Sequence, residues 1–187
     1  MKTGKTVKVL LTAATAAGML AGCGSKTDTD TFRFASELDI QGMDSTVVDD
    51  GMSFNAIHAI TDGLTAVNEK GKTAPAIAKS WDVSDDGKTY TFHLRDAKWS
   101  NGDKVTANDF VYSWRKIIKD AGNYAYMLGN GGASVKNADA LMELGANATD
   151  EQMATLGVTA KDDKTLVVEL ENKVPYYTLR ASTKDSA

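Results

Sequence analysis

The clearest pattern in the chain is the strict alternation of polar and apolar residues at positions 88–95. Successive residues of a strand point to opposite faces, so Tyr90, Phe92 and Leu94 share the apolar face of a predicted strand. The preceding Asp85-Asp86-Gly87 tolerates the backbone conformation of a tight turn. The pattern therefore predicts a β-hairpin whose second strand buries three large side chains.

The spacing of apolar residues changes to that of a helix after position 106. The apolar positions are Ala107, Phe110, Val111, Trp114, Ile117 and Ile118. They fall on one side of a helix with 3.6 residues per turn. Thr106 and Asp109 form the capping pattern of a helix N-terminus, and Gly122 is typical of a helix end. We expect an amphipathic helix between these signals, with its apolar stripe in the core.

Weaker patterns predict the remaining elements. They are a strand at 31–36, a helix at 54–64, short helices at 138–144 and 150–156, and a second hairpin at 158–170 around the turn 162–163. The segment 39–51 is rich in Gly, Asp and Ser and is predicted to be a loop. His58 lies beside the apolar stripe of its helix, where a boundary residue is a better interpretation than a ligand. Helices interspersed with hairpins predict a mixed α/β fold.

The first 22 residues have the composition of a secretory signal peptide. The segment begins with three lysines, Lys2, Lys5 and Lys8, and contains no acidic residue. An apolar run with many small residues then extends from residue 9 to residue 22. The run is too short to span a bilayer comfortably, and it lacks the bulky periodic face of a core helix. The pattern predicts export, with residues 1–22 as the signal peptide.

The end of this run, Leu20-Ala21-Gly22-Cys23, resembles a bacterial lipobox. The resemblance implies cleavage before Cys23 and attachment of a diacylglycerol to its thiol, with palmitate among the acyl chains. Two or three chains hold a protein stably at a membrane, where one would bind reversibly. Residues 23–30 are small and polar and are predicted to be a flexible tether. We expect a lipoprotein anchored to the extracytoplasmic face of the cell membrane; an unmodified free cysteine is the alternative.

Composition and charge exclude several functions. The chain has 187 residues with 21 basic and 25 acidic side chains, and residues 23–187 carry a formal charge of −7. This acidic balance argues against nucleic acid as a partner. One cysteine and two histidines cannot form an intramolecular disulfide or a Cys/His zinc site.

Motifs for catalysis and for cofactors are weak. The chain has no Gly-x-Ser-x-Gly elbow, and its paired carboxylates lie in predicted loops or turns, where solvated Asp is ordinary. The run 82–93 ends in His93, where a calcium loop requires a bidentate Glu. Gly-rich residues 129–132 lack the strand and the lysine of a phosphate-binding loop. We expect no metal, no cofactor and no enzymatic activity.

Three long blocks of sequence follow one another in a recognisable order. They run from Ala78 to Arg95, from Ala97 to Trp114 and from Leu156 to Tyr176. Together they resemble the extracellular solute-binding proteins of peptide ABC importers, family 5. The resemblance implies a two-lobed mixed α/β receptor of the type II periplasmic-binding-protein class, with an extra N-terminal subdomain. It also implies that the protein captures oligopeptides outside the membrane and delivers them to ABC permease subunits. A surface lipoprotein acting as a pheromone receptor or adhesin on the same scaffold is the alternative.

The same resemblance implies a peptide-binding site. Asp49, Asp50 and Gly51 correspond by position to a loop that lies along the ligand backbone in relatives. Tyr124 falls where a tyrosine of the oligopeptide-binding relatives touches ligand, and Tyr126 is its rival because the spacing differs by one residue. The aromatic residues of the hairpin and of the capped helix are expected to build the core instead. These are Trp81, Tyr90, Phe92, Trp99 and Trp114.

Family members are much longer than this chain. The resemblance therefore places residues 31–187 in the N-terminal part of the first lobe plus the extra subdomain, with the second lobe missing. The polar residues 180–187 also depart from the apolar continuation that is typical of the family. A fragment of this kind is expected not to bind peptide with useful affinity, because its relatives enclose the ligand between two lobes.

Overall fold

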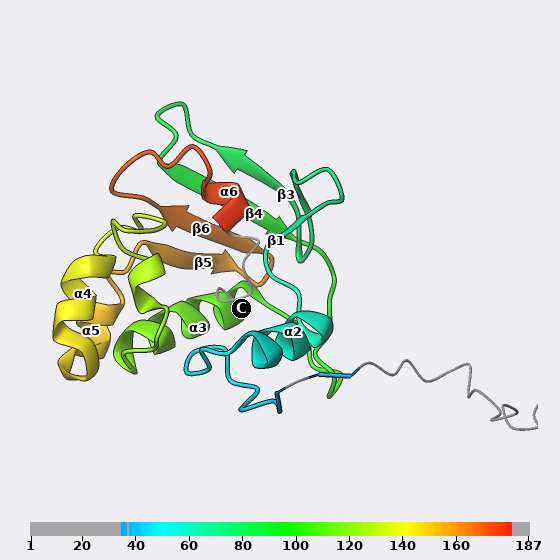
Figure 1. Cartoon of the computed structure of the whole chain (residues 1–187). Helices are drawn as coiled ribbons and strands as arrows, with labels where there is room; N and C mark the ends of the chain where they lie inside the picture. Colours follow the sequence, from blue (N-terminus) through cyan, green and yellow to red (C-terminus); the bar gives the residue numbers. More distant parts are fainter. Residues whose placement is uncertain (1–34, 37, 181–187) are drawn as a thin grey trace, which may run out of the picture. The chain divides into compact units, whose positions relative to one another are not determined.

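The computed structural model describes residues 35–36 and 38–180 of the chain (Figure 1). The predicted signal peptide, the tether with Cys23 and most of the predicted strand 31–36 lie outside the described residues. The chain divides into two units, and all of the described helices and strands belong to the second, which begins at Leu38.

An antiparallel sheet of four strands forms the centre of this unit, in the order β3-β4-β6-β5. Its strands are β3 (Ala78–Val83), β4 (Thr89–Leu94), β5 (Val158–Asp162) and β6 (Thr165–Glu169). Both predicted hairpins are confirmed, and they join because β4 pairs with β6 as well as with β3. Phe92 pairs with Trp81 on one side and with Leu166 on the other, so apolar side chains from different strands share one face.

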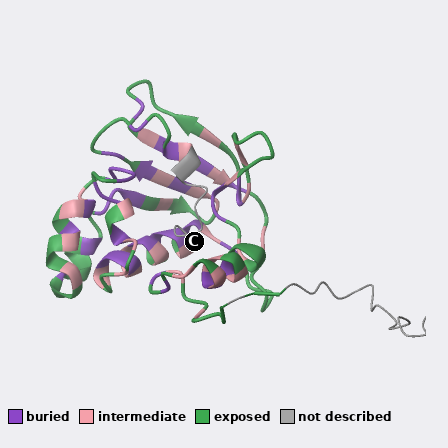
Figure 2. Ribbon diagram, viewed as in Figure 1, coloured by how far each residue is buried: buried purple, intermediate pink, exposed green. Residues whose placement is uncertain are grey.

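Helix α3 (Ala107–Lys119) covers this apolar face of the sheet and runs alongside β5 (Figure 1). Buried residues are concentrated in α3 and the central strands (Figure 2). Phe92 and Trp114 are almost fully buried there, as predicted. The opposite face of the sheet is polar, and on it His93 Nε2 lies 2.8 Å from Asp82 Oδ2. The alternation in the sequence thus separates core from solvent as expected.

The short helix α6 (Tyr177–Arg180) contributes a further aromatic ring to the core. The ring centroid of Tyr177 lies 4.4 Å from that of Tyr90 and 6.3 Å from that of Phe92. Its hydroxyl is buried and has no hydrogen-bond partner among the described residues. Burial disfavours the phenolate, so the pKa of Tyr177 is raised well above its usual value.

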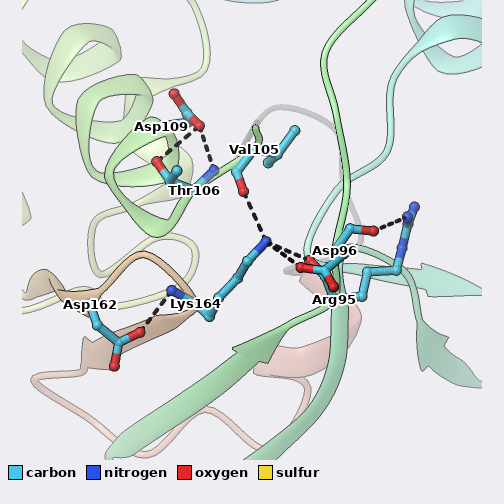
Figure 3. Close-up of polar contacts among 7 residues, drawn as sticks. All are labelled: Arg95, Asp96, Val105, Thr106, Asp109, Asp162 and Lys164. Atoms are coloured by element: carbon cyan, nitrogen blue, oxygen red, sulfur yellow. Dashed lines mark hydrogen bonds and ion pairs between the residues drawn. The ribbon is translucent and has the colours of Figure 1, made fainter. Parts of the chain in front are cut away.

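Polar contacts fix the N-terminus of α3 against both hairpins (Figure 3). Asp109 Oδ2 accepts hydrogen bonds from the backbone N–H and the hydroxyl of Thr106, at 2.7 and 3.2 Å. Lys164 Nζ lies 3.1 Å from the carbonyl oxygen of Arg95, 3.5 Å from that of Val105 and 3.3 Å from Asp96 Oδ1. One lysine of the β5–β6 turn therefore holds both the end of β4 and the residue before the helix cap.

The C-terminus of α3 differs slightly from the predicted one. The helix ends at Lys119, and Ala121 adopts the left-handed conformation with φ of 50°. Gly122 N–H then donates to the carbonyl of Ile117 at 2.9 Å. Gly122 is therefore not the left-handed residue that ends the helix. Its lack of a side chain instead allows the loop that contains Thr46 to approach closely.

The smaller elements surround this core. They are α2 (Gly51–Ile60), β1 (Thr65–Val67), β2 (Thr73–Pro75), η1 (Ala125–Met127), α4 (Ala138–Leu144), η2 (Gly145–Asn147) and α5 (Asp150–Met153). Strands β1 and β2 form a separate two-stranded sheet.

The predicted helix 54–64 is too long, because Thr61 has extended backbone and donates its N–H to the carbonyl of Ile57. Leu64 is fully buried outside that helix. Trp99 is also not a core residue, since it remains 44% exposed.

Candidate functional site

The predicted ligand loop ends at the N-terminus of α2. Asp50 caps the helix, because its Oδ1 accepts the backbone N–H of Ser53 at 2.8 Å. Hydrogen bonds from the Ser53 hydroxyl and then from its N–H hold the pKa of Asp50 below its usual range. Gly51, the first helical residue, is exposed, and apart from its chain neighbours and the nearby backbone of its own helix no heavy atom lies within 4 Å of where a Cβ would be. The backbone at this point is therefore open to a ligand.

The buried side chain of Ser53 fastens the preceding segment to α2. Its hydroxyl oxygen accepts the backbone N–H of Gln41 at 2.9 Å and that of Gly42 at 3.2 Å. Buried polar groups are stable in a protein only when they are paired, and these bonds pair two backbone donors with one hydroxyl. A single side chain thus holds two residues of a loop that has no strand partners.

A second tight turn shapes the loop before α2. Asp44 Oδ1 accepts the N–H of Thr46 at 2.9 Å and its hydroxyl at 2.6 Å. The carbonyl of Asp44 accepts the N–H groups of Val47 and Val48 at 3.2 and 3.1 Å. The hydrogen bond from the Thr46 hydroxyl is the largest cause that lowers the pKa of Asp44. The loop is therefore ordered by carboxylates that act on nearby backbone and hydroxyl groups.

This loop is joined to the segment that follows α3. Asn123 donates from its backbone N–H to the carbonyl of Thr46 at 3.0 Å and from Nδ2 to that of Val47 at 2.6 Å. A Cβ on Gly122 would lie 2.7 Å from the Thr46 carbonyl oxygen, so only glycine fits here. The two predicted site segments are consequently held side by side, although they are far apart in sequence.

A row of aromatic rings extends from α2 across this junction. The Tyr124 and Phe54 rings pack edge to face, with centroids 5.3 Å apart and planes at 75°. Phe54 lies 6.2 Å from the His58 ring on one side, and Tyr124 lies 6.4 Å from the Tyr126 ring on the other. Tyr126 is 59% exposed, and Tyr124 is half-buried. Tyr124 is thus positioned by α2, whereas Tyr126 projects further into solvent.

Several kinds of exposed group lie around the N-terminus of α2. Asp49 and Val47 are exposed on the loop, beside the open backbone of Gly51. A separate hollow of about 470 Å³, which none of these three residues lines, lies between residues 43–46 and α3. Backbone groups, a carboxylate and aromatic faces are the usual contacts of a peptide backbone. In the part of the chain that the structure describes, no three His, Cys, Asp or Glu side chains are placed to hold a metal ion.

The structure places Asp50 and Gly51 at the N-terminus of α2, with Asp49 just before it, and it packs Tyr124 against Phe54 of the same helix. Tyr126 contacts Tyr124 and is mostly exposed. Their contact with a ligand stays a prediction. Sequence reasoning overlooked Ser53 and Asn123, and it placed Phe54 only in the predicted helix 54–64. Asp50 and Ser53 stand at the spacing of a helix cap, a signal that was available in the sequence.

Cys23, the predicted lipidation site, lies outside the described residues. Across those residues, no helix combines the length and apolar character needed to cross a membrane.

Comparison with known sequences gives one consistent family. Residues 72–186 match the family described as "Bacterial extracellular solute-binding proteins, family 5 Middle". A dipeptide-binding protein of Lactococcus lactis is 39% identical over 181 residues, which cover 95% of this chain and 31% of that protein. The chain therefore spans about a third of the length of this relative.

Solved structures agree with the sequence comparison. The substrate-binding domain of an oligopeptide ABC transporter from Bacillus anthracis has a TM-score of 0.72 at 36% identity, over 82% of this chain and 28% of that one. Haemophilus influenzae OppA in complex with the peptide RPPGFSPFR has a TM-score of 0.68 at 39% identity, over 78% and 28%. The pheromone receptor PrgZ, described with its mode of peptide binding, has a TM-score of 0.68 at 30% identity, over 79% and 28%.

These comparisons confirm the fold class and the resemblance seen in the sequence. The described residues form a mixed α/β part of the type II periplasmic-binding fold. The family and the relatives named above are binding proteins. Because the family match covers more than half of the residues, this chain belongs to the bacterial extracellular solute-binding proteins of family 5.

Proposed function

We propose that the protein is the substrate-binding component of a peptide ABC importer, which captures oligopeptides outside the membrane and delivers them to the permease subunits. The observation that carries the proposal is the junction of the 44–51 loop with residues 122–126 in a chain of this family. The relatives named as dipeptide-binding and oligopeptide-binding proteins support the same ligand class. Its activity is binding and release, without covalent chemistry.

The proposed site recognises the backbone of an extended peptide. The absence of a side chain at Gly51 lets another main chain approach closely, and the exposed carboxylate of Asp49 offers an acceptor beside it. Tyr124 supplies a ring that Phe54 already holds in place, so little side-chain entropy is lost when a ligand binds. Contacts of this kind depend on the peptide backbone more than on its sequence, which suits a nutrient receptor.

A chimaera tests the role of the site. Residues 38–180 of this chain would replace the matching segment of the Bacillus anthracis relative, and a mixed peptide pool would be titrated calorimetrically. We expect saturable binding by the chimaera and a loss of about tenfold or more after Tyr124→Ala, as for removal of a central aromatic contact. Tyr176→Ala, at another exposed tyrosine, is the matched control and should bind normally. A folded chimaera that binds no peptide would refute the proposal.

Tyr124→Ala and Tyr126→Ala in this chimaera decide between the two tyrosines. Tyr124 is held by Phe54, whereas Tyr126 is mostly exposed, so we expect the larger loss of affinity from Tyr124→Ala. A larger loss from Tyr126→Ala would assign the ligand contact to its rival. Tyr124→Phe separates the contribution of the hydroxyl from that of the ring.

The proposal places the protein on the extracytoplasmic face of the cell membrane, anchored through an acylated Cys23. The lipobox-like residues 20–23 and the composition of residues 1–22 support this location. Cys23→Ser should abolish incorporation of labelled fatty acid and release the protein from the membrane fraction. Unchanged lipid labelling of the Cys23→Ser variant would rule the anchor out at this residue.

A pheromone receptor is the second candidate, favoured by the similarity to PrgZ. The two functions differ in how many peptides they accept. A nutrient receptor should accept most peptides of a mixed pool, whereas a pheromone receptor should respond to very few. Binding of a single peptide class by the chimaera would favour the second candidate.

A further inference from the structure

Asparagine followed directly by glycine occurs twice in the chain, at Asn101-Gly102 and at Asn130-Gly131. Such a pair can react with itself, because glycine has no side chain to hinder the attack of its backbone nitrogen on the asparagine amide. Both pairs are exposed, and both lie in turns of the backbone. The sequence therefore gives no reason to distinguish the two pairs, whereas the structure does.

The two glycine amides occupy different positions in their turns. Gly102 is the last residue of the first turn, and its N–H donates to the Trp99 carbonyl at 2.9 Å. In the second turn, the N–H of Gly132 donates to the Gly129 carbonyl at 2.9 Å, so Gly131 is a central residue. The N–H of Gly131 has no hydrogen-bond partner among the described residues. Its nitrogen is therefore free to lose a proton to solvent and to act as a nucleophile.

The two side-chain amides differ as well. Asn101 is held at both ends, because its Nδ2 donates to Asp103 Oδ2 at 2.7 Å and its Oδ1 accepts the Asp103 N–H at 3.0 Å. Asn130 is held at Oδ1, which accepts the Ser134 hydroxyl at 2.9 Å and Asn172 Nδ2 at 3.2 Å. Two donors on Oδ1 stabilise the negative charge that develops on this oxygen when the amide carbon is attacked. Asn130 Nδ2 has no partner in the part of the chain that the structure describes, so no bond opposes its departure.

We propose that Asn130 is a site of spontaneous deamidation and that the turn at Asn101 protects the other pair. The Gly131 nitrogen gives its proton to solvent and bonds to Cγ of Asn130. The bond from Cγ to Nδ2 then breaks, and Nδ2 takes up a proton and leaves as ammonia, which closes a succinimide ring. Water adds to either carbonyl of this ring and opens it to aspartate or isoaspartate. The reaction consumes water, releases ammonia and leaves the chain with an additional negative charge.

The modification changes the loop between η1 and α4. The two carboxylate oxygens of Asp139 lie 3.3 and 3.1 Å from the backbone nitrogen of Asn130, so a new carboxylate at position 130 is close to an existing one. The isoaspartate form also lengthens the backbone between Gly129 and Gly132, which the hydrogen bond of the turn now joins. The turn should therefore loosen in the modified protein.

The test incubates the full chain in a mildly alkaline buffer and follows both pairs by mass spectrometry of tryptic peptides. Cleavage after lysine places Asn101 in residues 99–104 and Asn130 in residues 120–136, so the two rates are measured separately. Fragment spectra separate Asn130 from Asn123 of the same peptide. We expect Asn130 to deamidate about tenfold faster than Asn101, which is the effect of one hydrogen bond on a rate. In denaturant, where neither turn persists, the two rates should converge. Equal rates in the folded chain, or a faster Asn101, would overturn the proposal.

Variants test the nucleophile and the Oδ1 donors separately. Gly131→Ala places a methyl group beside the attacking nitrogen, and beyond the chain neighbours this group meets no heavy atom within 4 Å. The turn should persist, and deamidation at Asn130 should slow by about tenfold. Asn172→Ala removes one donor to Oδ1 and should slow it by about threefold. Asn101 in the same sample is the matched control, and its rate should not change. An unchanged rate in Gly131→Ala would overturn the succinimide route, and an unchanged or faster rate in Asn172→Ala would overturn the role of the Oδ1 donors.

Discussion

Two regions of the protein are held together by different interactions. In the sheet and α3, the large apolar side chains of the predicted stripes are buried against one another. In residues 38–60, many large apolar side chains remain exposed. They are Leu38, Ile40, Met43, Val47 and Ile60. This second region is ordered mainly by polar side chains that bind backbone groups, such as Ser53 and Asp44.

The difference separates scaffold from candidate site. Hydrophobic burial is roughly proportional to area and gives a region most of its resistance to unfolding. Local polar bonds contribute less each, and regions that depend on them open at lower free energy. Exposed apolar groups in such a region also mark surfaces that contact a ligand or another part of a protein. The region around α2 therefore has the properties of a binding surface, and α3 with the sheet is its support.

The largest expected effect is in the scaffold. Phe92→Ala or Trp114→Ala should lower the free energy of unfolding by about 3–5 kcal/mol, because each leaves a cavity in a packed core. Tyr112→Ala on the solvent side of α3 is the control and should change it by less than about 0.5 kcal/mol. Chemical denaturation followed by tryptophan fluorescence measures Phe92→Ala, and circular dichroism measures all three. A loss below 1 kcal/mol for both core variants would contradict the division into scaffold and site.

The scaffold was predictable from sequence because its signals are local. The alternation at 88–95 and the stripe from Ala107 to Ile118 each identify which face is buried without reference to the rest of the chain. Trp99 was predicted incorrectly because a large aromatic residue in a turn does not reveal its burial. Leu64 continued a helical spacing by chance after the backbone had become extended.

The candidate site was predictable only in part. Asp49 to Gly51 and Tyr124 came from the family resemblance, and the contact between Tyr124 and α2 came from the structure. The bonds from Asn123 to Thr46 and Val47 join residues about 76 positions apart, and no local pattern encodes such a pair. Gly122 illustrates the difficulty, since a glycine after a helix has an ordinary explanation as a helix end. Its role in the close approach of two loops is visible only in three dimensions.

A smaller loss is expected where the two hairpins meet. Lys164→Met should reduce the free energy of unfolding by about 1–2 kcal/mol, because charge-assisted bonds to the Arg95 and Val105 carbonyls are lost. The side chain is 34% exposed, so water replaces part of the lost interaction. Lys161→Met, on an exposed lysine of the same hairpin, should have little effect. Equal unfolding midpoints in urea for the two variants would show that Lys164 does not stabilise the junction.

In the α2 region, Ser53→Ala should act locally. The Gln41 and Gly42 N–H groups lose their shared acceptor, with a cost of about 1 kcal/mol if water reaches them. Hydrogen exchange of these two amides should accelerate, while exchange in β4 and β6 should not change. Ser100→Ala, in an exposed turn, is the control. Faster exchange throughout the sheet would mean that the two regions unfold together and that the α2 region is not a separate, less stable unit.

The smallest effect concerns acid. Hydrogen bonds from Ser53 lower the pKa of Asp50 from its usual 3.8, so the folded state binds this proton less readily than the unfolded state. A lowered pKa contributes stability that is fully present above the unfolded value and is lost as the pH falls through the folded value. Asp44, whose pKa is also lowered, acts in the same direction. Below pH 4 the α2 amides should therefore lose protection from exchange before those of the sheet.

Asp50→Asn keeps an oxygen that can accept a hydrogen bond from Ser53, but its side chain cannot titrate. The variant should therefore reduce this pH dependence while leaving α2 formed at pH 7. Amide exchange in α2 at pH 3 and pH 7, compared between the native chain and Asp50→Asn, measures the effect. An identical pH dependence in the two proteins would show that Asp50 does not couple α2 to acid.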